Sequence, residues 1–185
     1  MVQRIANARE RFGKAAMEMF RTRGYAETTV PQIAAAAGLT ERTFFRYFID
    51  KPEVLFWRAV ELEAEMVLTI NQAADAMPLD LVIRALEAAG RFFDDNRADV
   101  LARQAVVAAH VDFQERELMK MRSLAMAICA ALTERGVGEI TARMAAESGI
   151  VIWRLAIERW SEEPQSGFAH CVRACAQELK AIITR

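Results

Sequence analysis

Residues 29–51 constrain the fold of this chain more than any other stretch. Apolar side chains recur at i, i+3, i+4 and i+7 from Val30 to Ala37, which predicts a short helix with one narrow apolar face. Gly38 is expected to end that helix, because glycine accepts the left-handed conformation that follows a helix end. The Thr40 hydroxyl can then cap a second helix. Two short helices joined by so tight a turn form a helix-turn-helix.

The second helix, predicted over residues 41–48, separates two kinds of side chain. Three phenylalanines at i, i+1 and i+4 are expected to anchor it inward: Phe44, Phe45 and Phe48. Four hydrogen-bonding side chains share the remaining surface, and these are Arg42, Thr43, Arg46 and Tyr47. Arginine can bond guanine bidentately in the major groove, threonine can reach a base or a phosphate, and tyrosine can contact the backbone. This surface therefore indicates DNA reading.

The spacing of these residues resembles the DNA-binding domain of the TetR family of bacterial repressors. The matching positions are Thr29, the A-x-x-A-G-L-T segment ending at Thr40, Thr43, Phe44, Tyr47, Phe48, Lys51 and Leu55. By this resemblance, four residues are expected to contact DNA phosphates: Thr29, Thr43, Tyr47 and Lys51. The segment from Thr40 to Arg46, which includes Arg42, is expected to face the bases. Phe45 stands where the family often has a tyrosine.

Charge is divided unevenly along the chain. Residues 1–52 carry nine lysines or arginines and five acidic residues, whereas the remainder carries 15 lysines or arginines and 20 acidic residues. The net charge is only −1. The basic N-terminal part is nevertheless attracted to phosphates while the acidic remainder is repelled, which orients the molecule on a duplex. Double-stranded DNA is therefore the predicted macromolecular partner.

Composition also bounds the compartment. Hydrophobic residues make up 54% of the chain, yet no apolar run is long enough to span a bilayer, and the N-terminal residues lack a signal-peptide segment. Three cysteines lie in apolar helical patterns without metal-ligand spacing: Cys129, Cys171 and Cys175. An odd, sparse count fits a reducing compartment. The chain is predicted to be cytoplasmic, with no membrane partner.

Helical patterns continue through the rest of the chain. The first helix is predicted from about Asn7, spaced with Glu10 as a capping box, to Arg23. A long fourth helix is predicted from Pro52 to about Ala76. Five further helices are expected after it, with breaks near residues 94–96, 110, 136–138 and 162–167. No stretch alternates convincingly at period two, so an all-α fold is predicted.

The last two helices have an unusual apolar content. Residues 149–157 are interrupted only by Arg154, and the final helix carries a single stripe of Phe168, Val172, Cys175, Ala176, Leu179, Ile182 and Ile183. Such a stripe suits a four-helix bundle made by two subunits. TetR-like proteins dimerise in this way, and a two-fold homodimer would read a palindromic operator. An intrachain core for both helices is the alternative.

Methionines, aromatic residues and a few polar groups in the middle of the chain suggest a small-molecule site. Adaptable apolar walls with few orienting polar groups are typical of such pockets. The candidate contacts are Met66, Phe93, His110, Phe113, Met126, Trp153 and Arg154. A core or surface role is the alternative for each, because periodicity does not separate a cavity wall from a filled core. The predicted ligand is a small, largely apolar effector.

These patterns together predict two domains. A three-helix helix-turn-helix DNA-binding domain at residues 1–50 precedes a helical ligand-binding and dimerisation domain at residues 51–185. The predicted function is transcriptional regulation, with repression released by the effector. Two alternatives are a helical scaffold that does not read DNA and a helical-bundle enzyme. No cofactor and no catalytic set is expected, and His110, Asp112 and Glu115 make a poor metal site with only two histidines in the chain.

Overall fold

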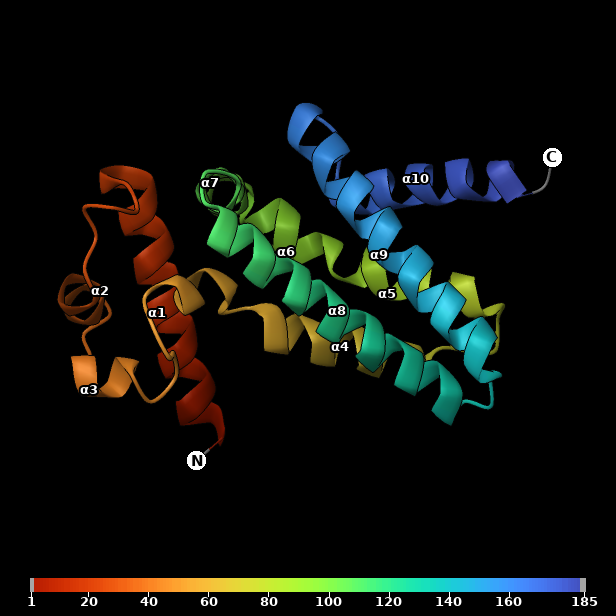
Figure 1. Ribbon diagram of the computed structural model, residues 1–185, viewed down its shortest axis with the longest axis horizontal. Helices are drawn as coiled ribbons and strands as arrows, with labels where there is room; N and C mark the ends of the chain where they lie inside the picture. Colours follow the sequence, from red (N-terminus) through yellow and green to blue (C-terminus); the bar gives the residue numbers. More distant parts are fainter. Residues whose placement is uncertain (1, 184–185) are drawn as a thin grey trace. The chain divides into compact units, whose positions relative to one another are not determined.

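A computed structural model of the chain describes the backbone of residues 2–183 and the side chains of residues 8–182. The helices, labelled in Figure 1, are α1 (Val2–Arg23), α2 (Val30–Ala36), α3 (Glu41–Phe44), the 3₁₀ helix η1 (Pro52–Phe56), α4 (Ala59–Gln72), α5 (Pro78–Ala88), α6 (Gly90–Asp95), α7 (Arg97–Ala108), α8 (Val111–Glu134), α9 (Glu139–Glu162) and α10 (Phe168–Ile183). No strand occurs between residues 2 and 183, so the all-α prediction is confirmed. Over the same residues, no helix has the length and hydropathy that crossing a membrane requires.

The chain divides into two compact units, each built from two separate segments. The first, called the head unit below, comprises Met1–Val60 and Arg97–Glu117. The second unit comprises Glu61–Asn96 and Leu118–Arg185. The division falls inside two continuous helices, because α4 begins at Ala59 and α8 runs from Val111 to Glu134.

The core of the head unit forms where α1 packs on α2, η1 and α7. Phe12 of α1 is fully buried, and its ring centroid lies 5.3 Å from that of Phe44 and 6.1 Å from that of Phe48, edge-on in both cases. Gly13 lets the Trp57 ring approach the α1 backbone, since a Cβ at this position would lie only 2.3 Å from Trp57 Cδ2. These contacts bury the apolar faces of several short helices that are too short to be stable alone.

Two predicted helix boundaries in this part of the chain are wrong. The first helix begins at Val2 and already includes Asn7, whose side chain lies outside the described residues. The long fourth helix is split into η1 and α4, because side chains occupy carbonyls that a continuous helix would need. Arg103 Nε donates to Leu55 O and Arg9 Nε donates to Trp57 O, each at 2.8 Å.

The end of α4 and one later break also differ from the predictions. The helix α4 stops at Gln72 rather than near Ala76. At this end of α4, Arg135 Nη1 donates to Ile70 O at 3.0 Å and to Asn71 O at 3.1 Å. A break at Ala89 separates α5 from α6, so six helices rather than five follow α4 in the described chain. The four predicted breaks, near residues 94–96, 110, 136–138 and 162–167, are confirmed.

In the second unit, α9 packs against α5 and α10, and Figure 1 shows these three helices close together. Four aromatic rings gather here, from Phe93, Trp153, Trp160 and Phe168. The closest pair, Phe93 and Phe168, stacks at 4.4 Å between centroids. Asp94 Oδ1 ties the cluster to the start of α10 by accepting from Trp160 Nε1 and from Phe168 N, each at 2.9 Å.

The stripe predicted to form the dimer interface on the final helix is largely used inside the chain. Phe168, Val172 and Ala176 are buried against the rest of the second unit. Cys175 and Leu179 are half-buried, Ile182 is exposed, and the side chain of Ile183 lies outside the described residues. The buried part of the stripe belongs to an intrachain core with α5 and α9, and a dimer role for the stripe stays a prediction.

Candidate nucleic-acid interface

The turn between α2 and α3 has the geometry that the sequence predicts. Gly38 has φ +62°, and the amides of Gly38 and Leu39 donate to Ala35 O and Ala34 O, both at 2.9 Å. This pair of bonds is the Schellman arrangement that satisfies the last carbonyls of a helix. Arg11 adds a further restraint, since its Nη2 donates to Ala37 O and, at 3.3 Å, to Gly38 O.

A threonine is the N-cap residue of each helix of the motif, Thr29 for α2 and Thr40 for α3. Gln32 Oε1 accepts from the Thr29 amide at 2.9 Å at the start of α2. At the start of α3, the Thr43 amide donates to Thr40 Oγ1 at 3.2 Å, which confirms the predicted cap. The two hydroxyls of Thr40 and Thr43 also lie 2.9 Å apart and share a hydrogen bond. The chain therefore enters α3 in a fixed direction.

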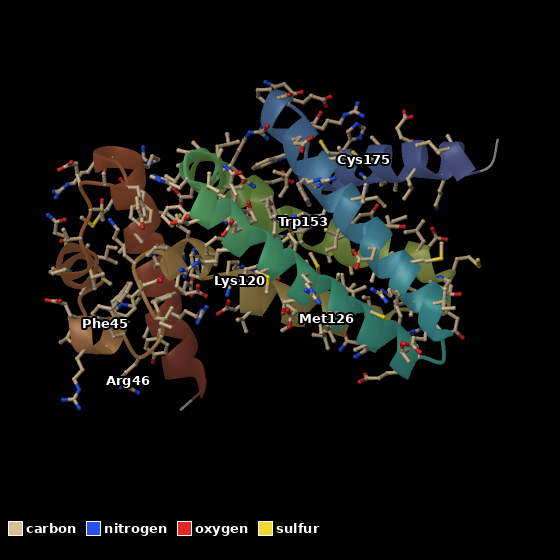
Figure 2. The ribbon with its side chains drawn as sticks, viewed as in Figure 1. Phe45, Arg46, Lys120, Met126, Trp153 and Cys175 are labelled. Atoms are coloured by element: carbon tan, nitrogen blue, oxygen red, sulfur yellow. The ribbon has the colours of Figure 1, made fainter. Side chains whose placement is uncertain are left out.

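The second helix is shorter than predicted and one of its faces is assigned wrongly. It spans Glu41–Phe44, after which the chain tightens as Arg46 N and Tyr47 N donate to the carbonyls three residues back. Phe44 and Phe48 are buried as expected, but Phe45 is 56% exposed. The Phe45 amide still donates to Glu41 O four residues back, so Phe45 follows Phe44 by a normal helical step of about 100° and lies off the face that Phe44 and Phe48 share. Figure 2 shows Phe45 and Arg46 together at this end of the head unit.

The residues predicted to contact DNA differ in exposure. Thr29, Thr40, Arg42 and Arg46 are exposed, while Thr43, Tyr47 and Lys51 are half-buried. The two arginines, with Phe45, form an exposed group that we call the reading surface. Guanidinium groups and an aromatic edge suit base edges and thymine methyl groups in a major groove.

Lys51 has a structural position that its sequence motif does not reveal. Its Nζ donates to Tyr25 O and to Thr28 O, both at 2.9 Å, and lies 4.0 Å from the centroid of the Tyr25 ring. Burial lowers the pKa of this ammonium. An ammonium carries three donors, so these two bonds leave one N–H for a phosphate. Lys51 thereby fixes the loop before α2.

Sequence reasoning missed the basic residues that hold the head unit in shape. Besides Arg11, Arg9 donates to Trp57 O, and Arg103 pairs with Glu117 at 2.8 Å. Arg116 of α8 forms two bonds with Asp50 and a third with Glu53. No sequence spacing signals these contacts, because Arg103 and Arg116 lie far along the chain from the residues they hold.

The seven predicted ligand contacts are divided between the two units. His110 and Phe113 belong to the head unit, where the Phe113 and Tyr25 rings meet edge-on at 5.1 Å. The other five lie in the second unit, and they are Met66, Phe93, Met126, Trp153 and Arg154. Met66, Phe93 and Trp153 are buried, whereas Met126 and Arg154 are exposed. Figure 2 shows Met126 on α8 and Trp153 on α9. Their roles as ligand contacts stay predictions.

The head unit and its reading surface define a helix-turn-helix DNA-binding protein with a second, all-helical unit. Residues 14–56 match the family model described as bacterial regulatory proteins, tetR family. The HTH-type transcriptional regulator TcmR of Streptomyces glaucescens is 42% identical over 52 residues, which are 28% of this chain and 23% of that protein. The match thus spans about a quarter of the curated relative.

Solved structures extend the likeness over nearly the whole chain. Thermus thermophilus FadR, a TetR-family repressor solved with lauroyl-CoA, is 25% identical with a TM-score of 0.59, over 91% of each chain. A transcriptional regulator from Aquifex aeolicus VF5 is 18% identical with a TM-score of 0.62, over 95% of this chain and 99% of that one. A putative TetR-family regulator from Syntrophomonas wolfei is 14% identical with a TM-score of 0.70, over 96% of this chain and 95% of that one. The N-terminal part of the chain thus matches the DNA-binding domain of the TetR family, and nearly the whole chain shares the fold of TetR-family regulators.

Proposed function

We propose that this protein is a homodimeric, cytoplasmic repressor that reads a palindromic operator and is released by a small, largely apolar effector. The observation that carries the proposal is the reading surface, where Arg42, Phe45 and Arg46 are exposed together beside a capped α3. Exposed guanidinium groups on a rigid helical end are the usual means of reading base edges. The domain assignment at residues 1–50 and 51–185 remains part of this proposal.

The phosphate contacts are proposed for residues around that surface. Thr29, Thr43, Tyr47 and Lys51 lie beside the helix-turn-helix with hydroxyl or ammonium donors. Thr40 lies at the start of α3, between these donors and the arginines. Such contacts fix register and orientation, while the arginines carry sequence preference.

The dimer is proposed to form through an exposed apolar stripe on α9. Ile140, Met144, Val151 and Leu155 are 77%, 67%, 40% and 44% exposed. Their spacing of four, seven and four residues places them on one face of the helix. The opposite face of α9 is buried within the second unit, for example at Ala142 and Trp153. A second copy of the chain, related by two-fold symmetry, would cover the stripe.

The effector is proposed to bind in the second unit and to resemble an acyl-CoA in its apolar part. Support comes from the likeness to Thermus thermophilus FadR, which is solved with lauroyl-CoA. The large apolar side chains of the second unit, Met66, Phe93 and Trp153 among them, supply a suitable lining. Effector and operator affinities are then coupled reciprocally, so each ligand weakens binding of the other by the same factor. Regulation rather than catalysis is the proposed role.

DNA reading is tested with a duplex enriched by the wild-type protein from a randomised library. Fluorescence anisotropy should show Arg46→Gln binding this duplex roughly tenfold to a hundredfold more weakly, since a bidentate base contact contributes about 1–3 kcal/mol. Arg122→Gln, which removes an exposed arginine of α8, is the matched control and should bind as wild type does. Failure to enrich any sequence would favour the scaffold alternative. Addition of lauroyl-CoA should release the duplex if the effector assignment is right.

The dimer surface is tested by light scattering of purified protein. Val151→Glu combined with Leu155→Glu places two charges in the stripe and should yield monomers. Leu68→Glu charges an equally exposed leucine of α4 and should leave the dimer intact. A dimer that survives the double substitution would show that subunits meet elsewhere.

A further inference from the structure

A three-way ion cluster joins α8 to the segment that follows the helix-turn-helix. Arg116 Nη1 and Nη2 donate to Asp50 Oδ1 at 2.9 Å and to Asp50 Oδ2 at 2.8 Å. Arg116 Nη1 also donates to Glu53 Oε2 at 3.0 Å. All three side chains are partly buried, with 16–40% of their side-chain area exposed. A two-armed guanidinium–carboxylate pair of this kind fixes orientation as well as distance.

The same segment is held at two further points. The Glu53 amide donates to Asp50 Oδ1 at 2.8 Å, so Asp50 also caps the turn that begins η1. Arg103 of α7 donates to Leu55 O at 2.8 Å, and its guanidinium carbon lies 4.9 Å from the centroid of the Phe56 ring. Two arginines from α7 and α8 therefore fix residues 50–56 against the rest of the head unit.

In the sequence, Lys51 lies between Asp50 and Glu53, the two acidic residues that Arg116 binds. Its backbone position is set by Asp50 on one side and, through η1, by Glu53 on the other. Its Nζ in turn bonds Tyr25 O and Thr28 O, next to Thr29 at the start of α2. Arg116 is therefore connected to Lys51 through the peptide bond that joins Asp50 to Lys51, and Lys51 to the residue before Thr29 through its bond to Thr28 O.

We propose that Arg116 is a positioning residue for operator reading, which it performs by orienting Asp50 and Glu53 and through them Lys51 and the start of α2. This inference rests on the proposed function, because it assigns a role in DNA reading to a residue outside the reading surface. Arg116 itself does not touch DNA in this scheme. Since α8 continues unbroken to Glu134 in the second unit, Arg116 also lies on a helix that both units share.

Electrostatics and positioning predict opposite signs for one substitution. Asp50→Asn removes a negative charge near the reading surface, so simple attraction to phosphates would strengthen binding to every duplex. If the charged pair positions Lys51, the same substitution weakens binding to the operator, because the amide no longer forms the two-armed charged contact. Asn keeps the shape of Asp and its oxygen can still cap η1. The sign of the effect therefore separates the two explanations.

The experiment measures full-length protein against the enriched duplex and against a scrambled duplex of equal length, at two salt concentrations. Asp50→Asn should bind the enriched duplex about tenfold more weakly, the loss expected for one charge-assisted hydrogen bond, while scrambled-duplex binding stays equal or tightens. Arg116→Gln should lose a similar factor, and the double variant should lose no more than either single one, since both remove one pair. Equal or tighter binding of Asp50→Asn to the enriched duplex would overturn the proposal.

Controls keep a loss of folding apart from a loss of positioning. Arg21→Gln breaks the exposed pair of Arg21 with Glu18 in α1 of the same unit and should leave both affinities unchanged. Arg116→Lys keeps the charge but not the two-armed geometry and should recover only part of the operator affinity. A variant that unfolds early would lose binding to both duplexes alike, which contradicts positioning. If wild-type protein enriches no sequence, the proposed function itself fails.

Discussion

The head unit adds to its aromatic core a set of arginines that donate to carbonyls and carboxylates of distant segments, whereas the centre of the second unit is a cluster of four aromatic rings. Arg11 and Arg116 illustrate the first kind of contact, with partners on distant segments. The stacked rings of Phe93 and Phe168 illustrate the second. A hydrogen bond to a charged group fixes direction, while apolar burial is non-directional.

This difference matches what each unit presents to its surroundings. The head unit exposes the arginines that we propose to read base edges, a role that requires accurate placement and for which directional restraints behind them are useful. The second unit exposes the apolar stripe that includes Met144 and Leu155 on α9. Apolar packing tolerates rearrangement better than a fork of hydrogen bonds does. The comparison predicts that substitutions act through different quantities in the two units.

The largest loss of stability is expected for Trp160→Ala in the second unit. Trp160 is fully buried against the rings of Phe93 and Phe168, and its Nε1 donates to Asp94. Removing so large a buried side chain should lower the free energy of unfolding by about 3–5 kcal/mol, measured by chemical denaturation. Trp160→Phe keeps a ring and should cost clearly less. A cost below about 1 kcal/mol for alanine would show that burial does not dominate this unit.

Local sequence signals predicted the helix-turn-helix because each signal there acts within a few residues. Gly38 ends α2 with a positive φ, and Thr40 caps α3. The breaks near residues 94–96 and 136–138 were equally readable, since helix ends depend on nearby capping residues and glycines. Local chemistry of this kind is visible in a single sequence.

Features set by distant residues were not predictable in the same way. The fourth helix is interrupted at Leu55 and Trp57 because Arg103 and Arg9 reach their carbonyls from other helices. Phe45 is exposed because it lies a full helical step of about 100° away from the face of Phe44 and Phe48, so this error came from assigning three phenylalanines to one face. The candidate site was therefore predicted at the level of its motif, but the residues that position it were not.

A smaller loss is expected where the head unit does depend on close packing. Gly13→Ala would place a Cβ 2.3–2.6 Å from three ring atoms of Trp57, which is itself buried. Alanine favours helix by about 1 kcal/mol, but overpacking at so close an approach costs up to about 3 kcal/mol, so net destabilisation of up to roughly 2 kcal/mol is expected. The free energy of unfolding from urea denaturation measures it.

The matched control is Gly138→Ala. Gly138 has a negative φ, and a Cβ added there would meet no heavy atom within 4 Å, so this substitution should cost no more than about 1 kcal/mol, the preference of an N-cap for glycine over alanine. If Gly13→Ala were as mild, the close approach of α1 and Trp57 would not constrain the head unit.

The smallest expected effect is a pH dependence that belongs to the head unit. Burial, with a contribution from Asp50, raises the pKa of Tyr25 from 10.0 to about 12. As pH rises from 10 to 12, the phenol ionises in the unfolded chain but stays protonated in the folded one. The unfolded state then binds fewer protons, so the stability that Tyr25 contributes is complete below pH 10 and is lost as pH approaches 12.

Tyr25→Phe removes this titration while keeping the ring that contacts Lys51 and Phe113. Free energies of unfolding measured at intervals from pH 8 to pH 11.5 should fall more steeply for wild type than for the variant above pH 10. Lys51 acts in the opposite direction, because its lowered pKa means that the folded state releases its proton first. Both proteins share that contribution, so their difference isolates Tyr25. Parallel curves would show that the Tyr25 hydroxyl is solvated. Alkaline pH would then not act selectively on the hydrogen-bonded contacts of the head unit.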